Sequence, residues 1–323
     1  MQSKLLARIG IVSLVFWLNS AQSQTVDSMP GRMEIHAFQS RTLSGDDFLL
    51  NTAGAGTPVT LAGELRLPQG TSAKWPVLVL VHGSGGLAGS TDLWVHHLNQ
   101  AGIAAFVLDT FAGRGIVSTV ADQTQLNSLA MMVDTYRALD LLSKHPRIDP
   151  KKISVIGFSK GAVASIFSAS TRFKGMYGSE AQFASHIGLY TPCNSRYLSD
   201  TQVSGAPMRF FHGTTDDYVS VVPCRAYVQQ LQQKGVDATL TEFPDTDHSY
   251  DSPLTPQRLT ITAAQSTRNC LFTESKPGQM VNAKSGAPFS YSDSCVEKGA
   301  HIGHNPASTT STIKAVIEFL KKL

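Results

Sequence analysis

The chain has 323 residues, of which 42% are hydrophobic and 16% are charged, and its formal net charge at pH 7 is +3. This length is sufficient for one large domain with a sizeable core. The near balance of cations and acids excludes the strongly basic surface that binding to nucleic acid or to an anionic membrane requires.

The first 23 residues have the pattern of a secretory signal peptide. Lys4 and Arg8 supply positive charge, segment 9–18 is apolar, and small residues at 21–23 suit a signal peptidase. Ten apolar residues are too few to cross a bilayer, although an uncleaved membrane anchor is the competing interpretation. Removal of 1–23 leaves a single domain, 24–323, with 25 cationic and 24 acidic side chains and a net charge of +1. We expect this mature chain to be secreted or periplasmic and free of the membrane.

Strand and helix patterns alternate along the rest of the chain. The first half is expected to contain edge strands in a hairpin at 33–42 and 59–67, a buried strand at 75–81, a helix at 92–101, a buried strand at 103–108 and an amphipathic helix at 125–145. The second half is expected to contain a strand at 153–156, a helix at 162–167, strands at 187–190, 208–211 and 238–243, and helices at 219–234 and 309–323. This alternation predicts an α/β fold with a mostly parallel sheet and helices on both faces.

The most informative motif is the pentapeptide Gly-Phe-Ser-Lys-Gly at 157–161. An apolar strand precedes it and a helix of small residues follows it, so Ser159 lies on a sharp turn between strand and helix. A serine at such a turn has a strained backbone and an exposed hydroxyl, and the amides that begin the helix face it. We therefore take Ser159 as the candidate nucleophile of an acyl-transfer enzyme.

A serine nucleophile needs a base and an acid, and two later loops supply them. His248 follows the strand at 238–243, and Asp216 follows the strand at 208–211. The carboxyl ends of parallel strands share one edge of the sheet, so both side chains are expected near Ser159. His248 is the expected base, while His212 lies at the end of a strand and is expected to pack. Asp216 is the expected acid, and Asp217 is its rival, either as the acid or as the start of the following helix.

The tetrahedral intermediate also needs backbone amides that bind its oxyanion, each worth about 3 kcal/mol of barrier. Lys160 follows the nucleophile and supplies one amide. The loop His-Gly-Ser-Gly-Gly at 82–86 follows the first buried strand, and there Ser84 or Gly85 is expected to supply the second.

The cysteines are even in number and accompany an export signal, which favours disulfides. Of the three pairings of four cysteines, we expect Cys193–Cys224 and Cys270–Cys295. Since no Cys-x-x-Cys motif is present, and His301 and His304 fall in a segment rich in glycine and proline, no metal or other cofactor is expected. The polar segment 252–306 shows no periodicity and is expected to be an irregular insertion after the histidine.

These motifs resemble those of the dienelactone hydrolase family, in its exported form, within the α/β hydrolases. The resemblance rests on the loop 82–86, the turn 157–161, the Gly-x-x-Asp loop at 213–216 and the turn that ends in His248, and it covers about 55–250 with the last helix added. It implies the α/β-hydrolase fold and a Ser-His-Asp triad. The family's namesake enzymes use a cysteine, so Ser159 moves the expected substrate from a dienelactone to general esters.

Two further expectations follow from the resemblance. The stretch 109–115 is similar to the family's Asp-Ser/Thr-Phe-x-x-Arg-Gly segment, and its Arg114 is expected either to bind a substrate carboxylate or to pair with an acid and brace the loop. The insertion 252–306 departs from the minimal family pattern and is expected to form a cap or rim of the pocket.

The sequence thus predicts a secreted or periplasmic serine hydrolase that cleaves a small carboxylic ester through an acyl-enzyme. Peptide or amide cleavage on the same fold is one alternative. A non-catalytic binding protein on this scaffold is another, and it is less favoured because the nucleophile, the base and the oxyanion glycines are all present. The sequence carries no signal for an oligomeric state.

Overall fold

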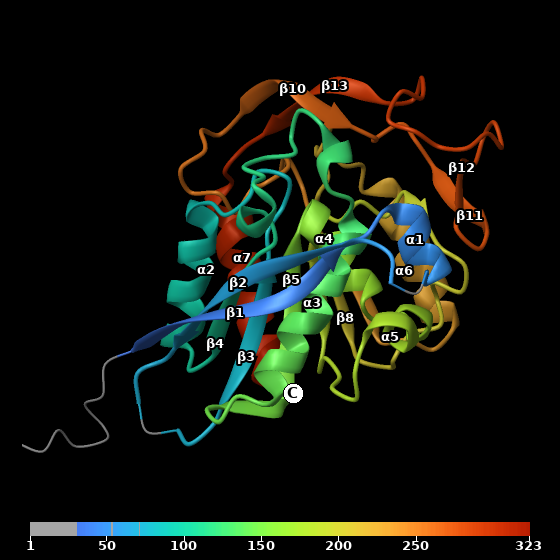
Figure 1. Ribbon diagram of the computed structural model, residues 1–323. Helices are drawn as coiled ribbons and strands as arrows, with labels where there is room; N and C mark the ends of the chain where they lie inside the picture. Colours follow the sequence, from blue (N-terminus) through green and yellow to red (C-terminus); the bar gives the residue numbers. More distant parts are fainter. Residues whose placement is uncertain (1–30, 53, 71) are drawn as a thin grey trace, which may run out of the picture.

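An eight-stranded sheet organises the molecule in the computed structural model, which describes residues 31–52, 54–70 and 72–323 (Figure 1). The strand order is β1-β2-β4-β3-β5-β6-β8-β9. The strands are β1 (Arg32–Thr42), β2 (Thr57–Leu67), β3 (Trp75–Val81), β4 (Ala104–Asp109), β5 (Ile148–Phe158), β6 (His186–Leu189), β8 (Met208–Gly213) and β9 (Ala238–Phe243). All neighbouring pairs from β4 to β9 are parallel, and β2 runs antiparallel to β1 and β4. The expected sheet is therefore confirmed, whereas the signal peptide expected at 1–23 lies outside the described residues.

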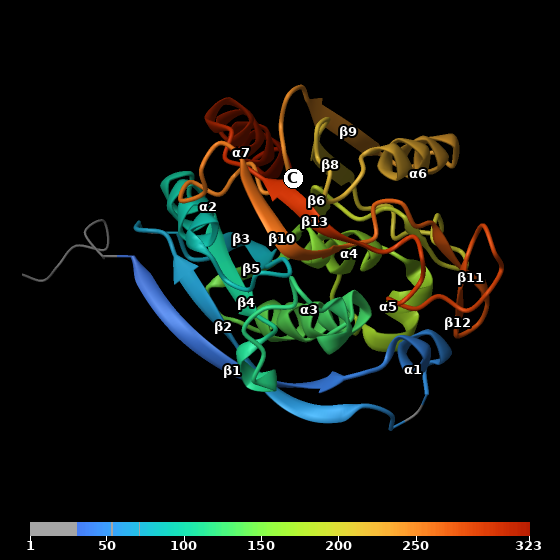
Figure 2. The ribbon, with the colours of Figure 1, turned by 90° about the horizontal axis from the view of Figure 1, so that it is seen from above.

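Helices cover both faces of this sheet (Figure 2). One face packs against α3 (Ser128–Ser143), α4 (Lys160–Phe167), α5 (Thr171–Tyr177) and α6 (Val222–Gln233), and the other packs against α2 (Gly89–Gln100) and α7 (Pro306–Leu320). In β3, Val79 belongs to the first core and Leu78 and Leu80 to the second, which explains the continuous apolar run. Within the described ranges, no helix is long and apolar enough to cross a membrane.

Two short α-helices, α5 and the one that follows β1, were not expected from the sequence. Helix α1 (Gly45–Leu50) lies in the connection between β1 and β2, where only a loop was expected. The side chain of Ser44 caps it by accepting the amide of Asp47, and Phe48 and Leu49 are buried. Six residues are too few to show a helical period, so tertiary packing and the cap account for this helix.

The expectation of an irregular insertion is wrong, because this segment forms two small sheets. Strands β10 (Leu259–Ser266) and β13 (Glu297–Ile302) pair antiparallel, while β11 (Phe272–Lys276) pairs with both β12 (Gln279–Asn282) and the two-residue β7 (Ser195–Arg196). Register shifts interrupt the pairing inside β10 and inside β11, so neither strand shows a sustained alternation of polarity. Figure 1 shows β10 and β13 across the edge of the main sheet at which the central parallel strands end.

Both expected disulfides are present. Cys193 and Cys224, whose Cα atoms are 4.9 Å apart, join the loop after β6 to the first turn of α6. Cys270 and Cys295, 5.1 Å apart, close a loop within the insertion.

A thiol titration tests this disulfide pattern. We expect the unfolded, unreduced protein to react with no thiol reagent, because every cysteine is paired. The same sample after reduction serves as the control and should titrate fully. Two or more free thiols before reduction would contradict the scheme.

Candidate active site

Ser159 lies on a strained turn between β5 and α4. Its backbone has φ 51° and ψ −116°, a left-handed conformation that costs a non-glycine residue about 1–3 kcal/mol. A Cβ on Gly161 would lie 2.2 Å from the carbonyl oxygen of Val81, so only glycine permits helix α4 to pass this close to β3. The fold therefore holds the serine hydroxyl at the end of the sheet.

Three polar side chains from separate segments form a hydrogen-bonded chain at this edge. The Oγ atom of Ser159 lies 2.9 Å from Nε2 of His248, and Nδ1 of His248 lies 2.7 Å from Oδ2 of Asp216. A carboxylate can only accept, so Nδ1–H donates to Asp216, and Nε2 is left to accept the serine proton. This arrangement allows His248 to remove that proton.

Asp216 is anchored as well as buried. Its Oδ1 accepts the amides of Tyr218 and Val219 at 2.9 and 2.8 Å. Burial on its own raises the pKa of Asp216, but the charge of His248 and hydrogen bonds from His212 and His248 outweigh burial and lower the pKa below its ordinary value. Asp216 is therefore ionised at neutral pH and can stabilise a charged imidazole.

The rival residues of the sequence analysis have other partners. Oδ2 of Asp217 lies 2.6 Å from Nδ1 of His301, and Oδ1 accepts the His301 amide at 2.8 Å, so this acid holds β13. Asp217 does not begin a helix, because α6 starts at Val222. His212 donates from Nε2 to the carbonyl of Val219 at 2.9 Å, and the same nitrogen lies 3.4 Å from Oδ2 of Asp216 and does not contact Ser159. Asp216, not Asp217, is thus the acid that contacts the histidine facing Ser159.

The loop after β3 lies directly beside Ser159. His82 fixes it, because its Nδ1 donates to the Gly83 carbonyl at 2.8 Å and its Nε2 accepts the Thr110 amide at 3.2 Å. Burial lowers the pKa of His82, so the imidazole is neutral, as this donor and acceptor pair requires. A Cβ on Gly83 would lie only 3.3 Å from Cβ of Ser159.

The expected oxyanion amides belong to Ser84 or Gly85 and to Lys160. Among the described residues, none of these three amides donates a hydrogen bond to a backbone carbonyl of a turn or loop. They remain available to an oxygen that develops negative charge beside Ser159.

Arg114 does not lie where a substrate ligand is expected. Its side chain is buried, with Nη1 2.7 Å from Oδ2 of Asp134 and Nη2 3.0 Å from Oδ1. Its Nε donates to Oγ1 of Thr42, and its Nη1 also donates to the carbonyl of Thr110. Arg114 lines neither pocket at Ser159. The expected substrate contact is therefore wrong, and Arg114 instead pairs with an acid and braces its loop.

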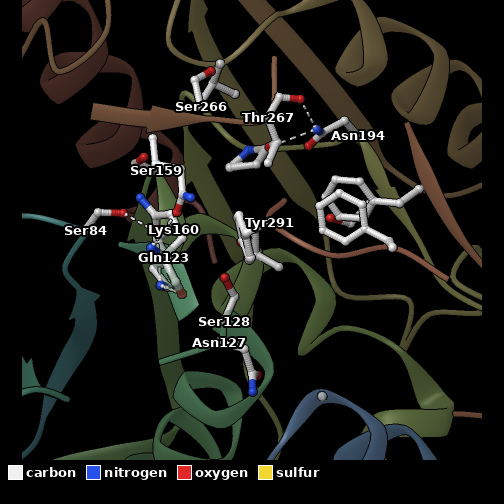
Figure 3. A pocket seen from close by; sticks show the side chains of 18 of the residues that line it. Ser84, Gln123, Asn127, Ser128, Ser159, Lys160, Asn194, Ser266, Thr267 and Tyr291 are labelled. Atoms are coloured by element: carbon white, nitrogen blue, oxygen red, sulfur yellow. Dashed lines mark hydrogen bonds between the residues drawn. The ribbon is translucent and has the colours of Figure 1, made fainter. Parts of the chain in front are cut away.

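Two pockets meet at Ser159. The Lys160 pocket contains Lys160, and the His248 pocket contains His248 and the 83–86 loop. Residues of the insertion line both pockets. Ser84, Ser159 and Tyr218 line both pockets. Figure 3 shows the Lys160 pocket with Ser159 at one side. Four large side chains of the insertion line the Lys160 pocket: Phe272, Met280, Phe289 and Tyr291.

The side chain of Lys160 is buried rather than solvated at the surface. Within the described residues, its Nζ hydrogen-bonds only to neutral acceptors, on Thr119 and Gln123. Burial lowers the pKa of Lys160 from 10.5 to about 7. A buried ammonium without a carboxylate partner destabilises the folded state.

This burial gives a testable pH dependence of stability. Between pH 7 and 10.5 the unfolded chain holds a proton on Lys160 that the folded chain has lost, so the free energy of unfolding should rise with pH. The slope from this residue is at most about 1.4 kcal/mol per pH unit. Urea unfolding of wild type and Lys160→Met should show this difference in slope, whereas Lys152→Met, at an exposed lysine, should not change it. Parallel curves for wild type and Lys160→Met would contradict the burial of charge.

One cluster in the described ranges has the composition of a metal site, but its hydrogen bonds oppose that role. Glu34, His36 and His145 bring ligand atoms within 4.8 Å of one another. Nδ1 of His145 accepts the Arg147 amide at 3.2 Å, so its Nε2 carries a proton and donates to Glu34 at 3.0 Å. His145 also precedes β5, at the opposite edge of the sheet from Ser159. We interpret this cluster as a structural hydrogen-bond network that joins Glu34 of β1 to His145, before β5.

The sequence analysis missed a second set of residues around His248. The ring of Tyr190 lies 4.5 Å from that of His248, and its hydroxyl donates to Asp251 at 2.8 Å. Trp94 donates to the same buried carboxylate at 2.7 Å. Together they fix the walls of the His248 pocket. The only signal in the sequence is that Asp251 follows the histidine by three residues.

The sheet and the arrangement of Ser159, His248 and Asp216 at its edge define the α/β-hydrolase class. Within this class, the model of the dienelactone hydrolase family matches residues 61–273. The chain therefore belongs to the dienelactone hydrolase family.

Solved structures support the fold. A dienelactone hydrolase-like promiscuous phosphotriesterase from metagenomic libraries is 15% identical with a TM-score of 0.56, over 90% of this chain and 98% of that one. A structure titled m3DLH is 16% identical with a TM-score of 0.58, over the same shares of the two chains. No curated protein matches the chain.

Proposed function

We propose that this protein is a serine hydrolase that cleaves carboxylic esters. The observation that carries the proposal is the hydrogen-bonded chain from Ser159 through His248 to Asp216, with contacts of 2.9 and 2.7 Å. Membership of a hydrolase family supports it.

In the proposed reaction, His248 takes the proton of Ser159 while Oγ attacks the ester carbonyl. The amides of Lys160 and of the 84–85 turn hold the resulting oxyanion. The carbon–oxygen bond to the alcohol then breaks, and His248 gives its proton to the leaving oxygen. Water, deprotonated by the same imidazole, attacks the acyl-enzyme and releases the acid and the free serine.

The two pockets divide the substrate between them. The leaving oxygen must lie next to Nε2 of His248 to receive its proton, so the alcohol belongs in the His248 pocket. The acyl group then belongs in the Lys160 pocket, where Phe272 and Phe289 stack with ring centroids 4.2 Å apart. The insertion thereby acts as a rim of both pockets, with its aromatic side chains on the acyl side.

We also propose that the protein acts outside the cytoplasm. The signal-like pattern of residues 1–23 and the two disulfides support export.

The function is tested by comparing an ester with its amide. We expect turnover of p-nitrophenyl acetate and little turnover of p-nitroacetanilide, because an anilide is the harder leaving group. Preference for the anilide would instead indicate an amidase. Background rates with both compounds would favour a binding protein.

The same assay with a panel of esters tests the assignment of the pockets. Phe289→Ala should change the preference for acyl length by roughly 3- to 10-fold, because it removes apolar wall area. It should leave the preference among alcohols unchanged. A change in the alcohol preference alone would reverse the assignment.

A further inference from the structure

A buried polar network beside the Lys160 pocket links the two expected sources of oxyanion amides. Its centre is Gln123, in the short 3₁₀ helix Gln123–Gln125, with 8% of its surface exposed. The Oε1 atom of Gln123 accepts from Nζ of Lys160 at 3.0 Å, from Oγ of Ser84 at 3.1 Å and from Oγ1 of Thr119 at 3.4 Å. Figure 3 shows Ser84, Gln123 and Lys160 side by side near Ser159.

Lys160 has no donor left for a substrate. Its Nζ carries three N–H groups when charged and two when neutral, and three acceptors surround it: Oγ1 of Thr119 at 3.2 Å, and the carbonyl and Oε1 of Gln123 at 3.1 and 3.0 Å. Its side chain therefore ties the first residue of α4 to the 119–123 segment.

The same segment is tied to the 82–86 loop and to the insertion. The Thr119 amide donates to the Ser84 carbonyl at 2.8 Å. The Gln123 amide donates to Oε1 of Gln265, in β10, also at 2.8 Å. The insertion thus holds the backbone of Gln123, and the side chain of Gln123 in turn holds Ser84 and Lys160.

We propose that Gln123 is a positioning residue for the oxyanion pocket, an inference that rests on the proposed ester hydrolysis. Oxyanion donors act only if they are held about 2.7–3.1 Å from the developing charge before it appears. One donor is the amide of Lys160, and the other belongs to the 84–85 turn. Gln123 holds the side chains of Lys160 and Ser84 on a single oxygen atom and so sets the distance between the two amides.

The test uses Gln123→Met, which keeps the length of the side chain and removes the acceptor. We expect kcat for p-nitrophenyl acetate, per site labelled by a fluorophosphonate, to fall by roughly 10- to 100-fold, with KM changed by less than about 3-fold. The inhibition constant of an alkylboronic acid, which forms a tetrahedral anion on the serine, should weaken by the same factor. Gln123→Glu keeps an acceptor for both donors and should restore most of kcat.

The matched control is Gln125→Met, the same change on an exposed glutamine of the same short helix, which should leave all three constants unchanged. Unchanged kcat per labelled site in Gln123→Met, or a loss of kcat without weaker boronate binding, would overturn the inference. If Gln123→Met does not fold, Ser84→Ala decides, since an unchanged kcat there also overturns it. An inactive wild type would instead refute the proposed function.

Discussion

Replacement of Ser159 by alanine should lower kcat for p-nitrophenyl acetate by about 10³- to 10⁶-fold. The substitution removes the only atom that the proposal assigns to covalent attack. The oxyanion amides, His248 and both pockets remain, so residual activity above the uncatalysed rate is expected. KM should change little, because the serine oxygen contributes to the transition state more than to ground-state binding.

A second serine provides the control for this substitution. Ser199 also has a positive φ, of 60°, but it is exposed and lines neither pocket at Ser159. Ser199→Ala should therefore keep wild-type turnover, although it places an alanine at a positive φ just as Ser159→Ala does. Equal activity of wild type and Ser159→Ala would rule out Ser159 as the nucleophile.

The second large effect is expected at the two residues behind the serine. His248→Ala should remove nearly all activity, because no other imidazole contacts Oγ of Ser159 in the described part of the chain. Asp216→Asn should lower kcat by about 10⁴-fold, because an amide favours the wrong tautomer of the histidine. The loss in both variants should appear in kcat, so that saturating substrate does not restore the rate.

A control residue is available for each of these two: Asp217 for Asp216, and His212 for His248. Asp217→Asn alters the contact with His301 on the insertion, and His212→Gln keeps a donor toward the Val219 carbonyl. Both variants should keep kcat within about 10-fold of wild type, provided that thermal melting shows them folded. A large loss in Asp217→Asn with little loss in Asp216→Asn would invalidate the assignment of the acid.

The convergence of the site was predictable because it depends on topology. Ser159, Asp216 and His248 each follow a strand of a parallel sheet, and such strand ends share one edge. Asp216 and Asp217 were harder to separate. The directions of these two adjacent side chains are set by their partners, His248 for Asp216 and His301 for Asp217. A loop has no regular spacing of residues from which such partners can be predicted.

The structure differs from the sequence expectations where contacts between residues far apart in the sequence determine the local structure. Arg114 was expected either to contact substrate or to pair with an acid, and the sequence did not show that Asp134, twenty residues away on α3, binds its guanidinium. The sequence analysis considered only the amide of Lys160, whereas the structure buries its side chain against Gln123, in a segment with no recognisable motif. The strands of the insertion escaped notice because bulges interrupt their alternation.

The most direct measurement is a fluorophosphonate label located by peptide mass spectrometry. Such a reagent forms a stable bond only with a serine whose proton a neighbouring base removes, and the amides that hold an oxyanion accelerate the step. We predict that the label appears on Ser159 in the wild type and that labelling slows greatly in His248→Ala. A label on another residue, or equal rates in the two proteins, would contradict the account.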